Sequence, residues 1–376
     1  MKYIEKLLPA AGVEWKKLGE VCKIKNGKSY KHLNDGDIPV YGSGGIMKYV
    51  DEAAYDSPSV LIPRKGSLKN LFYVETPFWN VDTIFYTEID VNQILPKYLY
   101  YFLATQKLEE LNLAGGVPSL TQTILNRLLI PIPPLHVQQE IVRILDKFTE
   151  LETELETELD LRKQQYERYR DQLLAPDKGF TVWKQIGEIF EIRNGYTPSK
   201  ANADFWTNGT IPWYRMEDLR ANERILEDSI QHITPQAIKG KGLFKAGSII
   251  LATSATIGEH ALINTDAMAN QRFTNFSIRK SLADSLIPKF IYYYFFVIDE
   301  WCKQNVNVSS FPSVDIERLK SVLFPIPPLH VQQRIVSLLD KFHTLTTSIS
   351  EGLPRELELR KQQYAYYRDQ LLAFER

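Results

Sequence analysis

A chain of 376 residues, 44% of them hydrophobic, is long enough to form two to four domains with separate cores. It has no apolar run long enough to cross a membrane and no N-terminal basic stretch leading into an apolar one, so the sequence predicts neither a membrane span nor a signal peptide. The net charge of −1 argues against an indiscriminate nucleic-acid binder. Cys22 and Cys302 lack metal-ligand spacing, and we expect two reduced, packed thiols in a cytoplasmic protein.

The charges are unevenly distributed along the chain. Residues 1–131 carry 15 basic and 14 acidic side chains, residues 179–324 carry 16 and 15, and residues 132–178 carry 7 and 11. The acidic surplus therefore lies in the middle segment, which is poorly suited to binding phosphate. Any contact with DNA is expected from the two flanking segments.

The sequence contains two copies of one plan. Four segments of the first half recur in the second half almost unchanged, and the start of each globular region repeats more weakly. Between the matched segments the two globular regions differ in sequence and length, which favours a common scaffold presenting two different specificities. The matched segments are 15–27 with 183–195, 132–139 with 326–333, 146–148 with 340–342, 161–166 with 359–364, and 169–174 with 367–372.

Each globular region is predicted to be an α+β domain. Ser59–Ile62 and Gly247–Leu251 have the apolar composition of buried strands, whereas Pro96–Leu113 and Ile287–Gln304 are expected helices rich in Tyr and Phe. The aromatic residues at helical spacing, such as Tyr98, are interpreted as core rather than as platforms for DNA bases.

Matching turns occur near the end of each globular region. Residues 117–120 and 311–314 each precede a predicted short helix and a strand that enters Pro-Ile-Pro-Pro.

Polar segments rich in Gly and Ser are the candidates for reading DNA, because their side chains can hydrogen-bond to base edges. For each residue, a solvated loop side chain and a contact with a DNA phosphate are the alternatives. The predicted DNA-binding residues are Lys28, Tyr30, Lys31, Tyr41, Ser43, Arg64, Lys65 and Ser67 in the first region, and Tyr196, Thr197, Ser199, Lys200, Trp213, Arg215, Thr253, Ser254, Asn270, Gln271 and Arg272 in the second.

The segment after each globular region is predicted to form one helix of a coiled coil. In the first copy, nine positions spaced by three and four residues are apolar or aromatic at seven. The second copy contains four extra residues, and Gly352 and Pro354 predict a kink or a restart there. Because the first helix leaves domain one and the second returns toward it, the pair is expected to be antiparallel. The nine positions are 145, 148, 152, 155, 159, 162, 166, 169 and 173.

The first spacer also contains a tetrapeptide repeat, Glu-Leu-Glu-Thr, over residues 150–159. Four residues make about one helical turn, so each unit lengthens the spacer by ~6 Å with little rotation of the domain that follows. A solvated acidic face around a leucine stripe explains the same pattern.

The matched segments carry a resemblance to a known family. Ile-Pro-x-Pro-Pro-Leu-x-x-Gln-Gln, leading into a helix that ends in Arg-Lys-Gln-Gln-Tyr-x-x-Tyr-Arg-Asp-Gln-Leu-Leu, resembles the specificity subunits of type I restriction–modification systems. The likeness covers nearly the whole chain and implies a bipartite DNA target with a gap. It also implies two methyltransferase subunits as partners, and restriction/translocase subunits in the full complex. S-adenosylmethionine, ATP and Mg are implied for those partners and no cofactor for this chain.

The resemblance assigns the matched helical segments to methyltransferase binding. The predicted contact residues are His136, Gln138, Gln139, Arg162, Gln165, Tyr169, Arg170, His330, Gln332, Gln333, Arg360, Gln363, Tyr367 and Arg368.

The predicted fold is therefore α+β, with two target-recognition domains separated by a long antiparallel two-helix coiled coil and an internal pseudo-twofold repeat. The expected boundaries are 1–134 for the first target-recognition domain, 135–178 for the central spacer helix, 179–328 for the second domain and 329–376 for the C-terminal spacer helix.

The sequence shows no catalytic or metal-binding constellation, so we expect a non-catalytic subunit. It contains neither the Asn/Asp-Pro-Pro-aromatic motif of methyltransferases nor Gly-x-Gly-x-x-Gly, and Gly27-Lys28-Ser29 lacks the earlier glycine of a phosphate-binding loop. Two alternatives stay open. A DNA-modifying enzyme with an unrecognised site would act on DNA alone, and a coiled-coil adaptor would retain no specific duplex.

Overall fold

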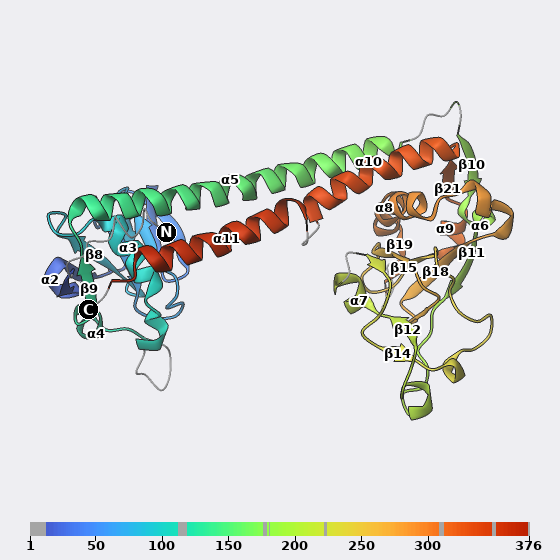
Figure 1. The fold of residues 1–376 in the computed structure, drawn as a ribbon, viewed down its shortest axis with the longest axis horizontal. Coiled ribbons are helices and arrows are strands. Elements are labelled where there is room, and N and C mark those ends of the chain that lie inside the picture. The colour runs from blue at the N-terminus through green and yellow to red at the C-terminus, as the bar shows by residue number, and fades with distance from the viewer. Residues whose placement is uncertain are drawn as a thin grey trace. The chain divides into compact units, whose positions relative to one another are not determined.

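The computed structural model describes residues 13–111, 119–175, 179, 181–221, 224–307, 312–347 and 351–374. The chain divides into two compact units: unit 1 comprises Met1–Leu155 and Leu357–Arg376, and unit 2 comprises Glu156–Glu356 (Figure 1). Each unit contains small sheets, short helices and parts of the long helices. The predicted α+β class is confirmed.

Unit 1 contains three sheets within its described residues. One has the strand order β2-β8-β5-β6, the second has the order β4-β3-β7, and β1 pairs with β9. The short helices α2 (Leu18–Val21) and α4 (Gln122–Asn126) and the longer α3 (Pro96–Thr105) accompany them. The strands are β1 (Glu14–Lys17), β2 (Cys22–Asn26), β3 (Asp35–Gly42), β4 (Gly45–Val50), β5 (Ser59–Pro63), β6 (Phe72–Val74), β7 (Trp79–Asn80), β8 (Ile84–Ile89) and β9 (Leu129–Ile132).

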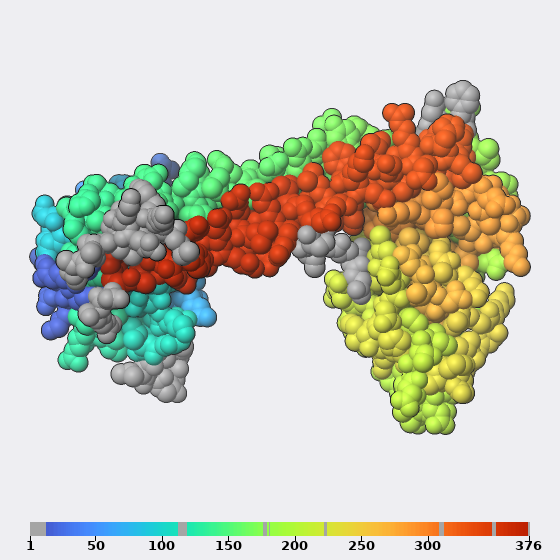
Figure 2. Space-filling view, in the orientation of Figure 1, coloured from blue at the N-terminus to red at the C-terminus, as the bar shows by residue number. Residues whose placement is uncertain are grey.

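Unit 2 contains a larger sheet with the order β11-β18-β15-β16-β13, a smaller sheet with the order β14-β12-β17, and the pairs β10-β21 and β19-β20. In the space-filling view the smaller sheet and its loops form a lobe that projects from the rest of the unit (Figure 2). Its helices are α6 (Ile186–Ile189), α7 (Met216–Ala221), α8 (Pro288–Gln304) and α9 (Ile316–Lys320). The strands are β10 (Val182–Gln185), β11 (Phe190–Asn194), β12 (Ile211–Tyr214), β13 (Ile225–Leu226), β14 (His232–Ile233), β15 (Ile249–Ala252), β16 (His260–Ile263), β17 (Met268–Ala269), β18 (Phe273–Ile278), β19 (Val306–Asn307), β20 (Ser313–Val314) and β21 (Leu323–Ile326).

The two units repeat the same framework, as the sequence predicted. The antiparallel order β2-β8-β5 corresponds to β11-β18-β15, and the pair β1-β9 corresponds to β10-β21. The parallel pair β3-β7 has Tyr41 opposite Asn80, and the parallel pair β12-β17 has Tyr214 opposite Ala269. The units differ in what surrounds this framework, because β3 continues into the hairpin strand β4 whereas β12 pairs with β14.

The elements expected from apolar runs are present, with one difference. The expected buried strands correspond to β5 and β15, and the second expected helix corresponds to α8. The first expected helix was predicted too long, because α3 ends at Thr105 and Gln106 adopts an extended conformation. This turn leads into a 3-10 helix at Leu108–Leu111, whose Leu108 is buried in the core; Leu113 lies outside the described residues.

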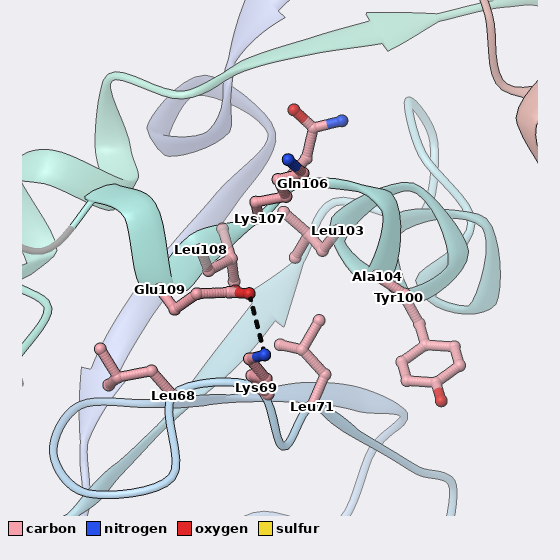
Figure 3. A pocket seen from close by; sticks show the side chains of 10 residues that line it. All are labelled: Leu68, Lys69, Leu71, Tyr100, Leu103, Ala104, Gln106, Lys107, Leu108 and Glu109. Atoms are coloured by element: carbon pink, nitrogen blue, oxygen red, sulfur yellow. Dashed lines mark ion pairs between the residues drawn. The ribbon is translucent and has the colours of Figure 1, made fainter. Parts of the chain in front are cut away.

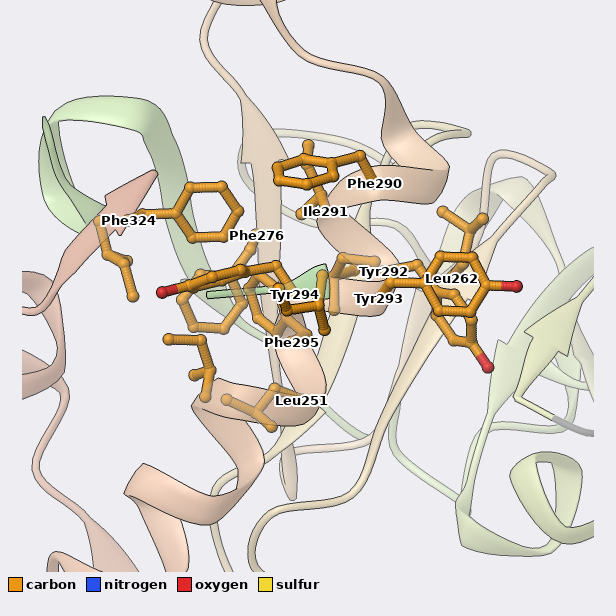
Figure 4. Packing of buried hydrophobic residues seen from close by; sticks show 14 of the residues in the cluster. Leu251, Leu262, Phe276, Phe290, Ile291, Tyr292, Tyr293, Tyr294, Phe295 and Phe324 are labelled. Carbon is orange, nitrogen blue, oxygen red and sulfur yellow. The ribbon is translucent and has the colours of Figure 1, made fainter. Parts of the chain in front are cut away.

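Aromatic side chains fill the core of unit 2 where α8 packs on the strands (Figure 4). The ring of Tyr294 lies 4.6 Å from that of Phe324 on β21, and Phe295 lies 5.2 Å from Phe276 on β18, between ring centroids. In unit 1 the corresponding helix buries Tyr98, which is fully inaccessible. The interpretation of these aromatics as core is confirmed.

Three long helices contain the coiled-coil seam, the row of apolar and aromatic residues spaced by three and four that the sequence predicted. They are α5 (Leu135–Leu173), α10 (Leu329–Thr347) and α11 (Gly352–Leu371). In unit 1 the start of α5 meets the end of α11, with Phe148 stacked 5.4 Å from Tyr367 (Figure 1). In unit 2 the end of α5 meets α10, where the rings of Tyr169 and Phe342 are 5.6 Å apart. Because the start of one helix meets the end of the other, the pairing in unit 1 is antiparallel, as predicted.

The predicted break in the second spacer is also present. Helix α10 ends at Thr347 and α11 begins at Gly352, two residues before Pro354. Gly352 has φ +78°, and a Cβ atom there would lie 2.6 Å from the carbonyl oxygen of Thr344. The chain therefore turns at a position that only glycine tolerates well before the helix restarts. Ile349, at a position predicted to lie in the coiled-coil seam of the second copy, is outside the described residues.

Candidate nucleic-acid interface

In unit 1, several predicted DNA-binding residues meet around Thr83, in the turn between β7 and β8. The backbone N–H groups of Arg64 and Lys65 donate to the Thr83 carbonyl oxygen at 2.9 and 3.2 Å. The Thr83 hydroxyl accepts the N–H of Ser43 at 3.3 Å, and the Asn70 side-chain amide donates to the Ser43 carbonyl at 3.0 Å. Three polar segments far apart in the sequence are thus held together, and Ser43, Arg64 and Lys65 use only backbone groups in these bonds, which leaves their side chains available for contacts.

The lysine-bearing loop after β2 is held against β7. The N–H of Lys28 donates to Asn80 at 2.8 Å, and Trp79 Nε1 donates to the Lys28 carbonyl at 3.0 Å. A Cβ atom on Gly27 would lie 2.0 Å from the carbonyl oxygen of Val81, so the glycine permits close packing of two backbones. The Asn-Gly pair that the sequence repeats therefore serves strand packing, not a phosphate-binding loop.

Unit 2 repeats this hydrogen-bonding pattern with different side chains. The N–H of Tyr196 donates to Ala269 at 2.9 Å, as Lys28 does to Asn80, and the N–H of Thr253 donates to Arg272 at 3.0 Å. A Cβ atom on Gly195 would lie 2.3 Å from the Ala269 carbonyl oxygen, so the close approach is repeated too. We call these segments the loop clusters; they comprise residues 28–31, 41–45, 64–67 and 80–83 in unit 1, and residues 196–200, 213–215, 253–256 and 269–272 in unit 2.

The predicted turns adjoin the loop clusters. The N–H of Leu120 donates to the Arg64 carbonyl at 2.8 Å, and that of Val314 donates to Thr253 at 2.9 Å. Residues 117, 118 and 311 of these turns lie outside the described residues.

The predicted DNA-binding residues differ widely in exposure. Those exposed to solvent are Lys28, Lys31, Lys65, Ser67, Ser199, Lys200, Gln271 and Arg272. Those partly buried are Tyr30, Tyr41, Ser43, Arg64, Tyr196, Thr197, Arg215, Ser254 and Asn270. The exposed set contributes amide and cationic donors of the kind that bond to base edges and phosphates.

Two residues of the prediction are wrong, because the structure buries them. Trp213 is 3% exposed, and its indole N–H donates to the Tyr196 carbonyl at 3.0 Å while its ring packs edge-on against Trp206. The Thr253 hydroxyl is buried and pairs with that of Thr274 at 2.9 Å. Both side chains hold their loop cluster together and are not available to a base.

Two other candidates have limited freedom. Tyr41 packs against Phe72 at 5.7 Å, and burial raises its pKa above the ordinary value. The Thr197 hydroxyl donates to Gln271 Oε1 at 2.5 Å, which joins two segments of the unit 2 loop cluster. Thr83, which the sequence reasoning missed, acts through both its carbonyl oxygen and its hydroxyl, and no local sequence pattern reveals these contacts.

The residues of the long helices that were predicted to bind the methyltransferase also differ in exposure. His136, Gln139, His330 and Gln333 are exposed, but Gln138 and Gln332 are fully buried. Assigning Gln138 and Gln332 to a partner surface was wrong: each side chain makes three hydrogen bonds to backbone groups of its own unit.

The repeated arginines near the helix ends make contacts within the chain. Arg162 donates to Gln165 at 2.9 Å, and its counterpart Arg360 donates to Gln363 at 3.1 Å. The guanidinium of Arg170 lies 4.7 Å from the centroid of the Phe296 ring, so this residue anchors α5 on α8. The remaining predicted residues, Tyr169, Tyr367 and Arg368, range from exposed to partly buried.

Repeated apolar residues on the helix surface were missed by the prediction. Leu161 is 60% exposed, and its counterpart Leu359 is 47% exposed. Each begins a stripe with spacing i, i+3 and i+7 on one helix face, a surface that the seam does not use. We call these the outer stripes; they comprise Leu161, Gln164 and Arg168 on α5, and Leu359, Gln362 and Tyr366 on α11.

A pocket of about 240 Å³ in unit 1 offers no catalytic constellation (Figure 3). Its lining includes Leu68, Leu71 and Leu103, and its acid Glu109 is paired with Lys69 at 3.6 Å. Across the described ranges, no group of three His, Cys, Asp or Glu residues is placed to hold a metal ion. Among the helices that the structure describes, none is both long and apolar enough to traverse a bilayer.

Comparison with known proteins gives concordant matches over the whole chain. Residues 11–161 and 181–359 match the type I restriction modification DNA specificity domain. The chain is 35% identical to the EcoR124I/EcoR124II specificity subunit of Escherichia coli, with 100% of this chain and 97% of that one covered. It is 33% identical to the putative specificity subunit S.HindORF215P of Haemophilus influenzae, with 99% and 98% covered. The Escherichia coli EcoprrI specificity subunit is 50% identical, but that match covers 51% of this chain and about half (50%) of the relative.

Solved structures show the same fold at low identity. A chain from a structure of type I R-M complex assembly and conformational transition matches with a TM-score of 0.67 and 19% identity, covering 97% of this chain and 98% of that one. The HsdS subunit from Thermoanaerobacter tengcongensis matches with a TM-score of 0.57 and 18% identity, covering 97% and 98%.

Proposed function

The chain belongs to the type I restriction–modification DNA specificity family, and we propose that it reads a bipartite DNA target, one half with each loop cluster. One observation carries this proposal. The same backbone hydrogen bonds hold four segments together in both units, yet the exposed side chains on those segments differ. A shared scaffold with different donors suits two unlike half-sites, because base identity is read by side chains on base edges.

The donors of each loop cluster suggest how each half-site is read. In unit 1, Lys28, Lys31 and Lys65 present cations, which suit phosphates and guanine edges. In unit 2, Gln271 and Arg272 stand side by side on the β17–β18 turn, and these residue types bond adenine and guanine edges. We assign the first set mainly to positioning on the backbone and the second to base reading.

We propose that this chain is itself non-catalytic. Among the residues of the loop clusters Asp82 is the one carboxylate, and it lies 4.0 Å from Lys65, so the clusters contain no paired carboxylates and no nucleophile–base pair. The chain would bind no cofactor, whereas S-adenosylmethionine, ATP and Mg would be bound by partner subunits. Because the substrate of such a system is cellular DNA, we place the protein in the cytoplasm.

We propose that the outer stripes dock two methyltransferase subunits, with restriction/translocase subunits joining in the full complex. The stripes suit this role because each exposes a leucine that the seam leaves uncovered, beside an amide. Two of the three positions are identical in the two copies, which suits two copies of one partner, and the third is Arg168 on α5 and Tyr366 on α11. The exposed residues His136, Gln139, His330 and Gln333 belong to the same proposed surface.

The experiment combines the full chain with a methyltransferase partner and selects bound duplexes from a randomised pool. The expected result is a bipartite sequence with a fixed gap. Arg272→Ala should relax one or more bases of a single half-site, since a good bidentate contact discriminates by about 1–3 kcal/mol.

Lys280→Ala is the matched control, because Arg272 precedes β18 and Lys280 follows its other end, and both are exposed. This variant should leave the selected sequence unchanged. Selection of no specific duplex, even with the partner present, would support a protein-only adaptor. Modification of DNA by the chain alone would support an enzyme instead.

A further inference from the structure

Each recognition unit is attached to its long helix at a buried glutamine. Gln138 on α5 accepts the N–H of Leu95 at 2.8 Å, and its amide donates to the carbonyls of Gln93 and Pro133 at 2.9 and 2.8 Å. Leu95 is the residue that precedes α3, and Pro96 is the first residue of that helix. The glutamine therefore fixes where α3 begins relative to α5.

Unit 2 repeats this attachment with the same geometry. Gln332 on α10 accepts the N–H of Ile287 at 2.9 Å and donates to the carbonyls of Ser285 and Pro327 at 2.8 and 2.7 Å. Ile287 precedes α8, again with a proline as the first helical residue. Both glutamine side chains are fully inaccessible to solvent.

A second attachment lies eight residues further along each long helix. In unit 1 the Tyr101 hydroxyl donates to Asp146 Oδ1 at 2.6 Å, and Lys97 lies 3.0 Å from the other carboxylate oxygen. Burial, followed by the hydrogen bond to Asp146, raises the pKa of Tyr101 above its ordinary value, so the hydroxyl stays protonated and donates. The carboxylate thus holds the middle of α3.

The same triad recurs in unit 2 at equivalent positions. The Tyr293 hydroxyl donates to Asp340 Oδ1 at 2.5 Å, and Lys289 lies 2.7 Å from Asp340 Oδ2. These contacts account for the repeated aspartate of Asp-Lys-Phe. An eight-residue separation places the two attachment points ~12 Å apart along the helix. Two points of attachment define an angle, whereas a single point would allow α3 or α8 to pivot.

We propose that these residues form a two-point clamp that sets the angle of each recognition unit on its helix, and thereby the gap length that the protein accepts. Gln138, Asp146, Gln332 and Asp340 are then positioning residues, acting through α3 and α8. The inference rests on the proposed function, because only a bipartite reader has a gap to select. Polar clamps suit this task because hydrogen bonds have strict geometry, whereas apolar contacts tolerate sliding.

The test removes the second attachment with the smallest possible change. The double variant Tyr101→Phe with Tyr293→Phe deletes only two hydroxyl groups, and both carboxylates keep their lysine partners. Tyr98→Phe is the matched control, because Tyr98 lies on the same helix and its hydroxyl donates to Pro131, in β9 rather than in a long helix. The full chain is assayed with its methyltransferase on targets whose gap is correct or altered by one or two base pairs.

The clamp predicts that the double variant loses gap selectivity. The ratio of methylation at the correct gap to that at a gap altered by one base pair should fall about tenfold, a change that one hydrogen bond to a charged group is strong enough to cause. The bases preferred in each half-site should stay the same, and Tyr98→Phe should keep the parent ratio.

Three results would overturn the inference. If the double variant keeps the parent ratio although its melting temperature falls as much as that of Tyr98→Phe, the contacts are merely stabilising. If the parent chain itself shows no gap preference, the bipartite function fails and the clamp inference fails with it. A change in half-site bases in place of gap preference would show that the tyrosines shape the loop clusters instead.

Discussion

Replacing Gln332 by leucine tests the buried attachment of unit 2 directly. The substitution keeps most of the side-chain volume but leaves three backbone groups without their partners: the N–H of Ile287 and the carbonyls of Ser285 and Pro327. The Pro327 bond is buried and the other two are partly buried. An unsatisfied buried group costs about 1–3 kcal/mol and a partly solvated one about 0.5–1.5 kcal/mol, so the free energy of unfolding should fall by roughly 2–6 kcal/mol.

Calorimetry of the full chain measures this loss. For a unit of this size each kcal/mol lowers the melting temperature by about 2–4 °C, so the transition of unit 2 should shift down by roughly 4–24 °C. Hydrogen exchange at the amide of Ile287 should accelerate in parallel. Gln333→Leu is the control, because the neighbouring glutamine is exposed and should change the melting temperature little. Equal shifts for the two variants would refute the assignment of Gln332 as a buried attachment.

Three further outcomes are expected. One additional Glu-Leu-Glu-Thr unit in α5 should widen the gap between the two half-sites of the DNA target and leave the bases of both half-sites unchanged. Sequencing of methylated genomes measures both properties. Altered half-sites would count against the role of this repeat as a spacer. The double variant Leu161→Ser with Leu359→Ser should reduce co-purification of the methyltransferase severalfold. The control is Leu345→Ser, at an exposed leucine outside the matched segments, which should not reduce it. Equal recovery of the methyltransferase with both variants would show that the outer stripes are not part of the docking surface. Burial raises the pKa of Cys22 and of Cys302 to about 12, so both thiols stay protonated at pH 8. Both thiols should therefore resist alkylation until the protein is denatured, and mass spectrometry of the labelled protein measures this. Rapid labelling of the native chain would contradict the prediction.

The repeat, the antiparallel pairing in unit 1 and the helix restart near Pro354 could be predicted because each depends on local chemistry or on spacing along the chain. Matched segments imply matched elements, and a coiled-coil seam is visible as a run of threes and fours. Gly352 and Pro354 end and restart a helix whatever lies around them. The start of each long helix directly after a Pro-Pro pair follows the same local logic.

The roles of individual polar residues could not be predicted in the same way. Gln138 and Gln139 are adjacent and chemically identical, yet the first is buried and the second is exposed. The difference was readable only from position, because Gln138 lies three and seven residues before the buried Ile141 and Leu145 and so shares their helix face. Trp213 was misjudged because it was grouped with Tyr214 and Arg215 as a polar segment, although its strand β12 lies between two others in a sheet.

The assembly of the loop clusters depends on contacts that no local pattern records. Thr83 joins segment 64–65 through its carbonyl oxygen and residue 43 through its hydroxyl, and Arg272 offers the equivalent carbonyl oxygen in unit 2. A backbone acceptor has the same chemistry whichever residue carries it. The sequence therefore predicted which segments are polar but not that they meet, and the tertiary structure supplied that information.

Exchanging residues 183–324 for the corresponding segment of another family member tests the central claim most directly. The exchanged chain is expressed with its methyltransferase, and the methylated sequence is determined across a genome. If the two units read separate half-sites, one half of the target changes, and the other half stays the same. If both halves change, or if the half assigned to unit 1 changes alone, the two loop clusters do not read DNA independently and the account is contradicted.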